Sequence, residues 1–249
     1  MDAPMAMIVF AGPSLGAAPE TDGRIVFRPP AACGDLLRAC GERPEAIGLI
    51  DGYFETRPSV WHKEILWALR QGVAVYGAAS MGALRAAECA AFGMIGLGQV
   101  FALYRDGVID RDDEVAVQHG PPETNYVLLS EALVNIRATL ARAVAAGVLE
   151  QGGADGLLAC AADLFYKERT WEAACAAWQA QGAEPVRAAA FLQWLPQHKV
   201  DVKRADALQL VAALLAHKGV DRPPAPAFDF AHTQFWEILR RRVGASDSA

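Results

Sequence analysis

The sequence predicts an α/β protein: a parallel sheet of the flavodoxin or Rossmann type in the N-terminal half, followed by an α-helical C-terminal region. Over the first 120 residues, short apolar runs alternate with longer segments of helical periodicity. Runs that are apolar throughout are typical of strands covered by helices on both faces. After residue 120 the strand-like runs stop and alanine-rich helical patterns follow. We therefore expect an α/β domain over residues 1–120 and a helical domain over residues 121–249.

Four apolar runs and one alternating run in the first half are the expected strands. They cover residues 7–11, 24–27, 46–50, 73–76 and 114–118. The last run alternates in polarity, as a half-exposed strand would. Apolar residues at helical spacing predict the helices of this half. These helices cover residues 31–40, 61–70 and 81–92.

The second half reads as a series of helices without strands. They are expected over residues 130–146, 154–167, 170–179, 184–195 and 202–218, with a short final helix over residues 233–242. An apolar stripe marks the helix that begins at residue 202. A proline-rich loop is expected over residues 223–226.

Charge and hydropathy exclude several classes of function. The chain has a net charge of -6, whereas binding to nucleic acid or to an anionic membrane surface needs a basic face. No apolar run has the length of a membrane span, and the N-terminus lacks the positive region of a secretory signal. We therefore expect neither a nucleic-acid partner nor a membrane partner. A homodimer is compatible with the sequence.

Cysteine and histidine usage indicates a reducing compartment and no metal. The five cysteines form no CxxC pair and are odd in number, which fits free thiols in a cytoplasmic protein. The five histidines lack zinc-ligand spacing. No nucleotide-binding fingerprint is present, so no cofactor is expected.

Three loops follow strands in the expected sheet and carry most of the polar or glycine-rich signals. They begin at Gly12, at Asp51 and at Gly77. In a parallel sheet, ligands bind beyond the carboxyl ends of the strands. We therefore expect these loops to lie close together and to form the site. The first loop, Gly12-Pro13-Ser14, is a turn that could cradle an anion with its backbone N–H groups.

Ser80 is the candidate nucleophile at the third loop. It stands where a strand, a run of small residues and a helix meet, so its hydroxyl could be presented above the sheet. Backbone N–H groups at the helix start could stabilise an oxyanion. Ala78 stands where a nucleophile-elbow motif has glycine, and a plain N-cap is the alternative interpretation of Ser80. The candidate substrate contacts of this loop are Gly77, Ala79, Met81 and Gly82, with Arg85 in the helix that follows.

His62 and Asp51 are the candidate partners of Ser80. His62 lies in the first turn of a helix near the same edge of the sheet and could act as its base, with Asp51 orienting the imidazole. The alternatives are a solvated histidine and a turn-capping aspartate. Arg57 could grip a partner's tail or form a salt bridge with Glu55.

Polar clusters on the expected helices of the second half have two interpretations. They are interhelical salt bridges, or they form a docking surface for a protein partner. The clusters are Glu131, Asn135 and Arg137; residues 166–171; and Lys203, Arg204 and Asp206.

These motifs together resemble the TfuA-like proteins. The resemblance covers about residues 8–120, with two shorter pieces beyond. The motifs that carry it are the strand-end Gly12-Pro13-Ser14-Leu15, Asp51-Gly52-Tyr53-Phe54, residues 60–65 (VWHKEI), residues 77–88 (GAASMGALRAAE), residues 133–137 (LVNIR) and residues 166–171 (YKERTW).

The resemblance implies a role beside a YcaO enzyme in backbone thioamidation. YcaO enzymes activate a backbone amide with ATP, and a TfuA-like partner is thought to help supply the sulfur. It is proposed to hydrolyse the C-terminal thiocarboxylate of a ThiS-like sulfur carrier. We expect Ser80 as nucleophile or polarising group, His62 as base and Asp51 as its orienter. A non-catalytic adaptor that recruits the carrier and activates YcaO, and a small-ligand-binding α/β domain, are the alternatives.

Overall fold

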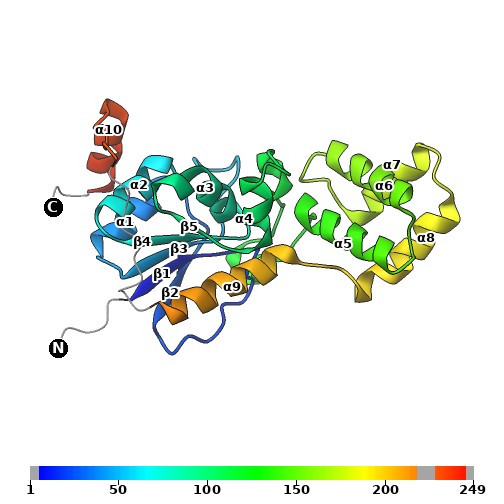
Figure 1. Ribbon diagram of the computed structural model, residues 1–249, viewed down its shortest axis with the longest axis horizontal. Coiled ribbons are helices and arrows are strands. Elements are labelled where there is room, and N and C mark those ends of the chain that lie inside the picture. The colour runs from blue at the N-terminus through cyan, green and yellow to red at the C-terminus, as the bar shows by residue number, and fades with distance from the viewer. Residues whose placement is uncertain (1–5, 218–227, 245–249) are drawn as a thin grey trace. The chain divides into compact units, whose positions relative to one another are not determined.

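The computed structural model describes residues 6–217 and 228–244 (Figure 1). The chain divides into two compact units. The first unit joins Met1–Asp110 to Arg204–Ala249, and the second is Arg111–Lys203. This division differs from the one expected from the sequence, since the last two helices belong to the unit that holds the sheet. The loop expected over residues 223–226 lies outside the described residues.

The first unit contains a five-stranded, fully parallel sheet, as the sequence predicts. The strands are β1 (Met7–Phe10), β2 (Ile25–Arg28), β3 (Ala46–Leu49), β4 (Ala74–Gly77) and β5 (Ile95–Gly96). Their order in the sheet is β2-β1-β3-β4-β5, which is the flavodoxin-like order. The first four strands agree with the expected runs, so the predicted fold class is confirmed.

The fifth strand expected over residues 114–118 is wrong. Asp112–Glu114 forms a 3₁₀ turn, and the residues after it join no strand of the sheet. The alternating pattern misleads because Glu114 is buried rather than exposed and pairs with Arg137, with 2.7 Å between Oε1 and Nη2. The fifth strand is instead the two-residue β5, which is too short to leave a periodic signal.

Helices cover both faces of the sheet (Figure 1). Those of the first unit are α1 (Asp35–Gly41), α2 (His62–Arg70), α3 (Met81–Cys89) with the 3₁₀ turn Ala90–Phe92, α4 (Gly98–Arg105), α9 (Val202–Ala216) and α10 (Gln234–Val243). Side chains alternate along each strand, so Ile8 and Phe10 pack with α1, α2 and α3, whereas Met7 and Val9 pack with α9.

Helix α9 explains why the end of the chain belongs with the sheet. Leu210 and Leu214 are fully buried and lie over Gly48 of β3. A Cβ at Gly48 would come within 2.7 Å of the Leu210 side chain, so the strand needs glycine where the helix crosses it. Burying each leucine contributes about 2 kcal/mol.

The second unit is helical, as its sequence predicts. Its helices are α5 (Leu133–Ala145), α6 (Gln151–Asp163), α7 (Trp171–Ala180) and α8 (Pro185–Trp194), with 3₁₀ turns at Pro122–Thr124 and Leu195–Gln197. They enclose a separate apolar core that includes Leu133, Leu157, Trp171 and Phe191.

The strand order places a topological switch point between β1 and β3. From β1 the chain moves to β2 on one side, then returns to β3 on the other side. In sheets of this order, ligands bind in the crevice that opens beyond the strand ends at this reversal. The ends of β1, β3 and β4 therefore form the edge at which a ligand site is expected.

Candidate functional site

The loops that follow β1, β3 and β4 are joined by backbone hydrogen bonds at one edge of the sheet. The Asp51 N–H donates to Phe10 (3.2 Å), and the Gly82 N–H donates to Ile50 (3.1 Å). The loop after β2 joins them, because the Ala31 N–H donates to Asp51 (2.9 Å). Four loops that are separate in the sequence thus form one continuous edge.

Asp51 clamps the loop that follows β1. Its buried carboxylate accepts hydrogen bonds from the N–H of Gly12 (2.8 Å), the N–H of Ser14 (3.0 Å) and the hydroxyl of Ser14 (2.6 Å). A buried carboxylate needs such partners, because burial without them is costly. The N–H groups of Gly12-Pro13-Ser14 that could have cradled an anion are therefore occupied by Asp51, and Pro13 has no N–H to offer.

Ser80 stands at a sharp turn between β4 and α3. Ala79 has a φ of +68°, and the Ser80 N–H donates to the carbonyl of Ala78 (2.8 Å), which closes a three-residue γ-type turn. A left-handed conformation costs a non-glycine residue about 1–2 kcal/mol. The strain falls on Ala79, one residue before the serine. This turn fixes the direction from which the Ser80 side chain leaves the backbone.

The Ser80 hydroxyl is left without a capping role. Ser80 occupies the N-cap position of α3, yet its side chain makes no cap hydrogen bond. The residue is 8% exposed, and within the described part of the chain its hydroxyl has no hydrogen-bond partner. Ser80 Oγ is not one of the fully buried side-chain atoms that lack a partner, so the hydroxyl still reaches solvent. The N-cap alternative thus accounts for the position of Ser80 but not for its side chain.

Small residues let the chain pass unusually close to itself around Ser80. A Cβ at Gly82 would lie 1.7 Å from the carbonyl oxygen of Leu49, and a Cβ at Gly77 would lie 2.2 Å from the carbonyl oxygen of Gly82. A Cβ at Gly52 would meet Met81 at 2.8 Å. These glycines hold the start of α3 against the ends of β3 and β4.

At the start of α3, the backbone N–H of Met81 is the donor that is available to bind an anion. The N–H groups of Ser80 and Gly82 donate to Ala78 and Ile50. Among the described residues, no hydrogen bond engages the N–H of Met81. The expected oxyanion site at this turn therefore has one donor, beside the Ser80 hydroxyl and at the positive end of the helix.

His62 has a different carboxylate partner from the one expected. It is the first residue of α2, and its Nε2 lies 2.8 Å from Oε2 of Glu88 on α3. Arg85 also donates to that oxygen (2.6 Å), and its Nε donates to the carbonyl of Val60 (3.1 Å). Burial would raise the pKa of Glu88, but the hydrogen bonds from His62 and Arg85 hold it below its usual value. Glu88 was not among the residues singled out by the sequence.

Asp51, His62 and Ser80 do not form a hydrogen-bonded triad in the described structure. Asp51 binds the Gly12–Ser14 loop, and His62, which is about half exposed, binds Glu88. Ser80 and Glu88 are eight residues apart along α3, which corresponds to about 12 Å along the helix axis. The imidazole is therefore held by a side chain of α3 and not by Asp51.

The two candidate arginines have partners within the chain. The guanidinium of Arg57 lies over the ring of Tyr53, 4.9 Å from its centroid, in the loop between β3 and α2. Arg85 is mostly buried and is held by Val60, Ser59 and Glu88. Arg57 keeps an exposed position at the strand-end edge, whereas Arg85 serves the contact between α2 and α3.

The cysteine thiols are poorly suited to nucleophilic chemistry. All five are free, and four are buried. Burial, with nearby Glu64 adding to it, raises the pKa of Cys33 to about 11 and that of Cys40 to about 12. Burial also raises the pKa of Cys89 and of Cys175 to about 11, and it raises the pKa of Cys160. The thiolate is the reactive form, so these residues favour an inert thiol at neutral pH.

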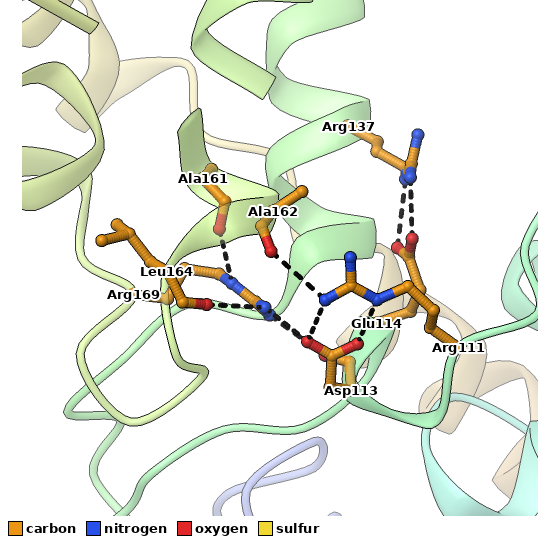
Figure 2. A network of polar contacts seen from close by, with 8 residues as sticks. All are labelled: Arg111, Asp113, Glu114, Arg137, Ala161, Ala162, Leu164 and Arg169. Carbon is orange, nitrogen blue, oxygen red and sulfur yellow. Dashed lines mark hydrogen bonds and ion pairs between the residues drawn. The ribbon is translucent and has the colours of Figure 1, made fainter. Parts of the chain in front are cut away.

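Two members of the expected polar clusters, Arg137 and Arg169, are engaged inside the second unit, as Figure 2 shows. Fully buried Arg169 donates to Asp113 Oδ2 (2.6 Å) and to the carbonyls of Ala161 (2.9 Å) and Leu164 (3.2 Å). Arg111 pairs with the same aspartate, and Arg137 forks onto Glu114. Burial would raise the pKa of Asp113, but the two guanidinium groups hold it below its usual value.

The remaining members of those clusters are also paired. Asn135 donates to Asp201 (2.9 Å), and Lys199 pairs with Glu131. Lys203 donates to the carbonyl of Val115 (2.6 Å), and Arg204 donates to that of Leu15 (2.6 Å). These contacts agree with the structural interpretation of the clusters.

Across residues 6–217 and 228–244, no group of three or more histidine, cysteine or carboxylate side chains could hold a metal ion. No helix described in those ranges is both long enough and apolar enough to span a bilayer.

The fold and the strand-end edge define a class, a parallel α/β protein with a serine presented at the switch-point side of its sheet. Residues 51–170 match the family model for TfuA-like protein. This match confirms the resemblance to the TfuA-like proteins noted from the sequence. The match includes Asp51, His62 and Ser80 and runs through the Arg169 network. No curated protein matches the chain.

Proposed function

We propose that this TfuA-like protein works beside a YcaO enzyme in the thioamidation of a peptide or protein backbone. In this proposal it releases sulfide from the C-terminal thiocarboxylate of a ThiS-like sulfur carrier. The match to the TfuA-like family model supports the pathway. The observation that carries the reaction is the Ser80 hydroxyl, which makes no capping hydrogen bond and stands at the strand-end edge of a parallel sheet.

The proposed chemistry is acyl transfer to Ser80 followed by hydrolysis. The Ser80 oxygen attacks the thiocarboxylate carbon, the C–S bond breaks, and hydrosulfide leaves as an ester forms. The Met81 N–H faces the oxyanion that develops during the attack. Water then cleaves the ester. The net reaction converts thiocarboxylate and water to carboxylate and hydrogen sulfide, and no atom is oxidised or reduced.

The other candidate residues take adjusted roles in this proposal. Asp51 holds the Gly12–Ser14 loop beside the site, because its carboxylate is engaged there. His62 is the acid–base group with Glu88 as its carboxylate, and it exchanges protons with water rather than directly with Ser80. The small walls between Gly77 and Gly82 admit a narrow carrier tail, and exposed Arg57 contacts that tail.

Replacing the Ser80 hydroxyl tests the proposal. Purified Ser80→Ala, mixed with a thiocarboxylated carrier and the YcaO enzyme, is expected to release sulfide at least about 100-fold more slowly than wild type. Ser59→Ala is the matched control, since Ser59 lies in the neighbouring loop and makes only a long contact with Arg85 (3.4 Å). Full sulfide release by Ser80→Ala would rule out the catalytic assignment.

A non-catalytic adaptor is the second candidate, and one observation favours it. The expected triad is not joined by hydrogen bonds in the described structure, because Asp51 and His62 bind other partners. An adaptor would recruit the carrier and activate YcaO without using Ser80. It predicts normal thioamidation with Ser80→Ala and normal binding of both proteins in a pull-down.

We also propose that the chain works in the cytoplasm. Its five cysteines are free in the structure, and free thiols persist in a reducing compartment. A thiocarboxylated carrier and an ATP-dependent enzyme would meet it there. Export of a functional, tagged chain to an oxidising compartment would contradict this placement.

A further inference from the structure

Helix α10 presents an apolar and basic stripe to solvent. Phe235 is 74% exposed, more than any other large apolar side chain in the described residues, and Ile238 is 54% exposed. Positions 235, 238 and 242 follow the i, i+3, i+7 spacing of one helical face. The exposed residues of this face, named here the α10 stripe, are Gln234, Phe235, Ile238, Arg241 and Arg242.

The opposite face of α10 is firmly packed, so the stripe is not the result of a loosely placed helix. Trp236 is fully buried, and its ring centroid lies 5.6 Å from that of Trp67 on α2. Leu239 packs beside Leu37 of α1. Thr233 caps the helix by accepting a hydrogen bond from the N–H of Trp236 (3.4 Å). The helix thus holds its outer face at a fixed place on the first unit.

The charge of the stripe sets the chemistry of its partner. Arg241 and Arg242 stand in the last turn, whereas the chain as a whole carries a net charge of -6. The one carboxylate of the helix, Glu237, is turned toward His232 (3.0 Å) and Arg240 (3.5 Å). The helix dipole accounts for basic residues in a last turn, but it does not account for exposed Phe235 and Ile238.

A second copy of the same stripe is a poor occupant. Pairing two stripes about a two-fold axis would bring two basic faces together, with no carboxylate on either to balance them. An apolar groove with an acidic rim complements the stripe, because the groove covers its apolar side chains and the rim pairs with its arginines. Recognition of a helical face with anchors at this spacing by an apolar groove is a common mode of protein binding.

We propose that the α10 stripe docks the sulfur-accepting enzyme of the proposed function through such an acidic-rimmed apolar groove. The inference rests on that function. The carrier tail must reach Ser80 at the start of α3, whereas the stripe lies on α10. Two separate surfaces allow the carrier and the enzyme to be bound together, so that sulfide is released beside its acceptor.

Binding of the purified YcaO enzyme to full-length variants tests the inference. The double variant Phe235→Asp/Ile238→Asp is expected to weaken the Kd at least about 30-fold, as loss of apolar interface anchors does. Arg241→Gln/Arg242→Gln is expected to slow association and to reduce its dependence on salt. The matched control is Val186→Asp on α8, an apolar residue that is 69% exposed outside the stripe.

The outcomes separate this inference from the proposed function. Loss of enzyme binding by the stripe variant, with normal carrier binding, normal thermal unfolding and normal binding by Val186→Asp, supports the inference. Binding within about twofold of wild type, or equal loss in the control, overturns it. If wild type binds the enzyme but releases no sulfide from the carrier, the proposed reaction fails while the docking surface stands.

Discussion

Three buried carboxylates in the first unit each hold backbone N–H groups of a distant segment. Asp51 binds the loop after β1, and Glu64 binds the N–H groups of Gly34 (2.8 Å) and Leu37 (3.4 Å) at the start of α1. Asp206 of α9 binds the N–H groups at the start of α4 (2.8 and 2.9 Å). Each satisfies donors that a helix start or tight loop leaves free. Single acidic residues thus fix how these elements meet.

Glu64 gives a prediction about pH. Burial raises its pKa from the usual 4.5, despite the hydrogen bonds that oppose the rise. Between 4.5 and the raised value the folded chain binds this proton more tightly than the unfolded chain does. The stabilising contribution is therefore full below 4.5 and is lost as the pH rises through the raised value.

Urea unfolding of wild type and Glu64→Gln over a range of pH measures this contribution. The free energy of unfolding of wild type, minus that of Glu64→Gln, is expected to fall as the pH rises from about 4.5. Glu123→Gln, at an exposed position outside these contacts, is the control and should show no such trend. A difference that grows with pH would contradict the assignment.

The cysteines give a prediction about the path of the sulfur. Cys33 is the one thiol that is partly exposed, and burial with nearby Glu64 raises its pKa to about 11. An unreactive thiol cannot efficiently carry persulfide sulfur. Cys33→Ser is therefore expected to release sulfide within about twofold of the wild-type rate. A persulfide on Cys33, found by mass spectrometry during turnover, would contradict the direct release of sulfide.

At the level of elements, close backbone packing at the strand ends is the feature that positions Ser80. Gly82 is the extreme case, because a Cβ there would lie 1.7 Å from the Leu49 carbonyl oxygen. Gly82→Ala is expected to lower the free energy of unfolding by more than about 3 kcal/mol, since the start of α3 must move. Denaturant unfolding measures the loss.

A glycine of the second unit is the matched control for that substitution. A Cβ at Gly152 of α6 would meet nothing within 4 Å. Gly152→Ala is expected to leave stability unchanged or to raise it by up to about 1 kcal/mol, because alanine favours the helix. Similar losses of unfolding free energy in Gly82→Ala and Gly152→Ala would contradict the claim that close packing at the start of α3 stabilises the fold.

The elements show how far the sequence predicts the site. Apolar runs located β1 to β4, and parallel strands end at one edge, so the meeting of the loops at Gly12, Asp51 and Ser80 follows from topology. Which side chains bond there depends on ångström-scale geometry that periodicity does not contain. The Asp51 carboxylate accepts hydrogen bonds from two N–H groups and a hydroxyl of the loop after β1, and not from an imidazole.

Glu88 and Glu64 were not predicted as site residues, although their spacing from neighbouring residues gave a weak indication of their contacts. Glu88 lies three residues after Arg85, the spacing at which helix side chains pair. Buried Glu64 lies three residues after the N-cap Trp61 and accepts its N–H, as the third helical residue does in a capping box. The partners of both residues come from other elements, which spacing alone does not reveal.

At the scale of the whole chain, the two compact units have separate cores. Arg169 holds the second unit together, since its buried guanidinium joins Asp113 to the end of α6 (Figure 2). Arg169→Met removes these contacts and is expected to cost that unit about 3 kcal/mol or more. Amide hydrogen exchange should speed up in α5, α6 and α7, and β1 to β4 of the first unit should stay protected.

Arg187→Met provides the control for this prediction. Arg187 of α8 is half exposed, and its ion pairs with Glu184 (3.4 Å) and Glu150 (3.8 Å) are long. Exposed pairs contribute little to stability, so exchange should be unchanged. Equal acceleration in both units of Arg169→Met would show that the chain unfolds as one body rather than as two units.

For the whole molecule, the proposed reaction depends on an acyl intermediate at Ser80, and this intermediate can be trapped. Wild type mixed with one equivalent of thiocarboxylated carrier, quenched during the first turnover and digested, is analysed by mass spectrometry. We expect the carrier's C-terminus to be joined as an ester to the peptide that contains Ser80, and we expect no such adduct in Ser80→Ala. Sulfide release at the wild-type rate by Ser80→Ala, with no adduct in wild type, would contradict the proposed reaction.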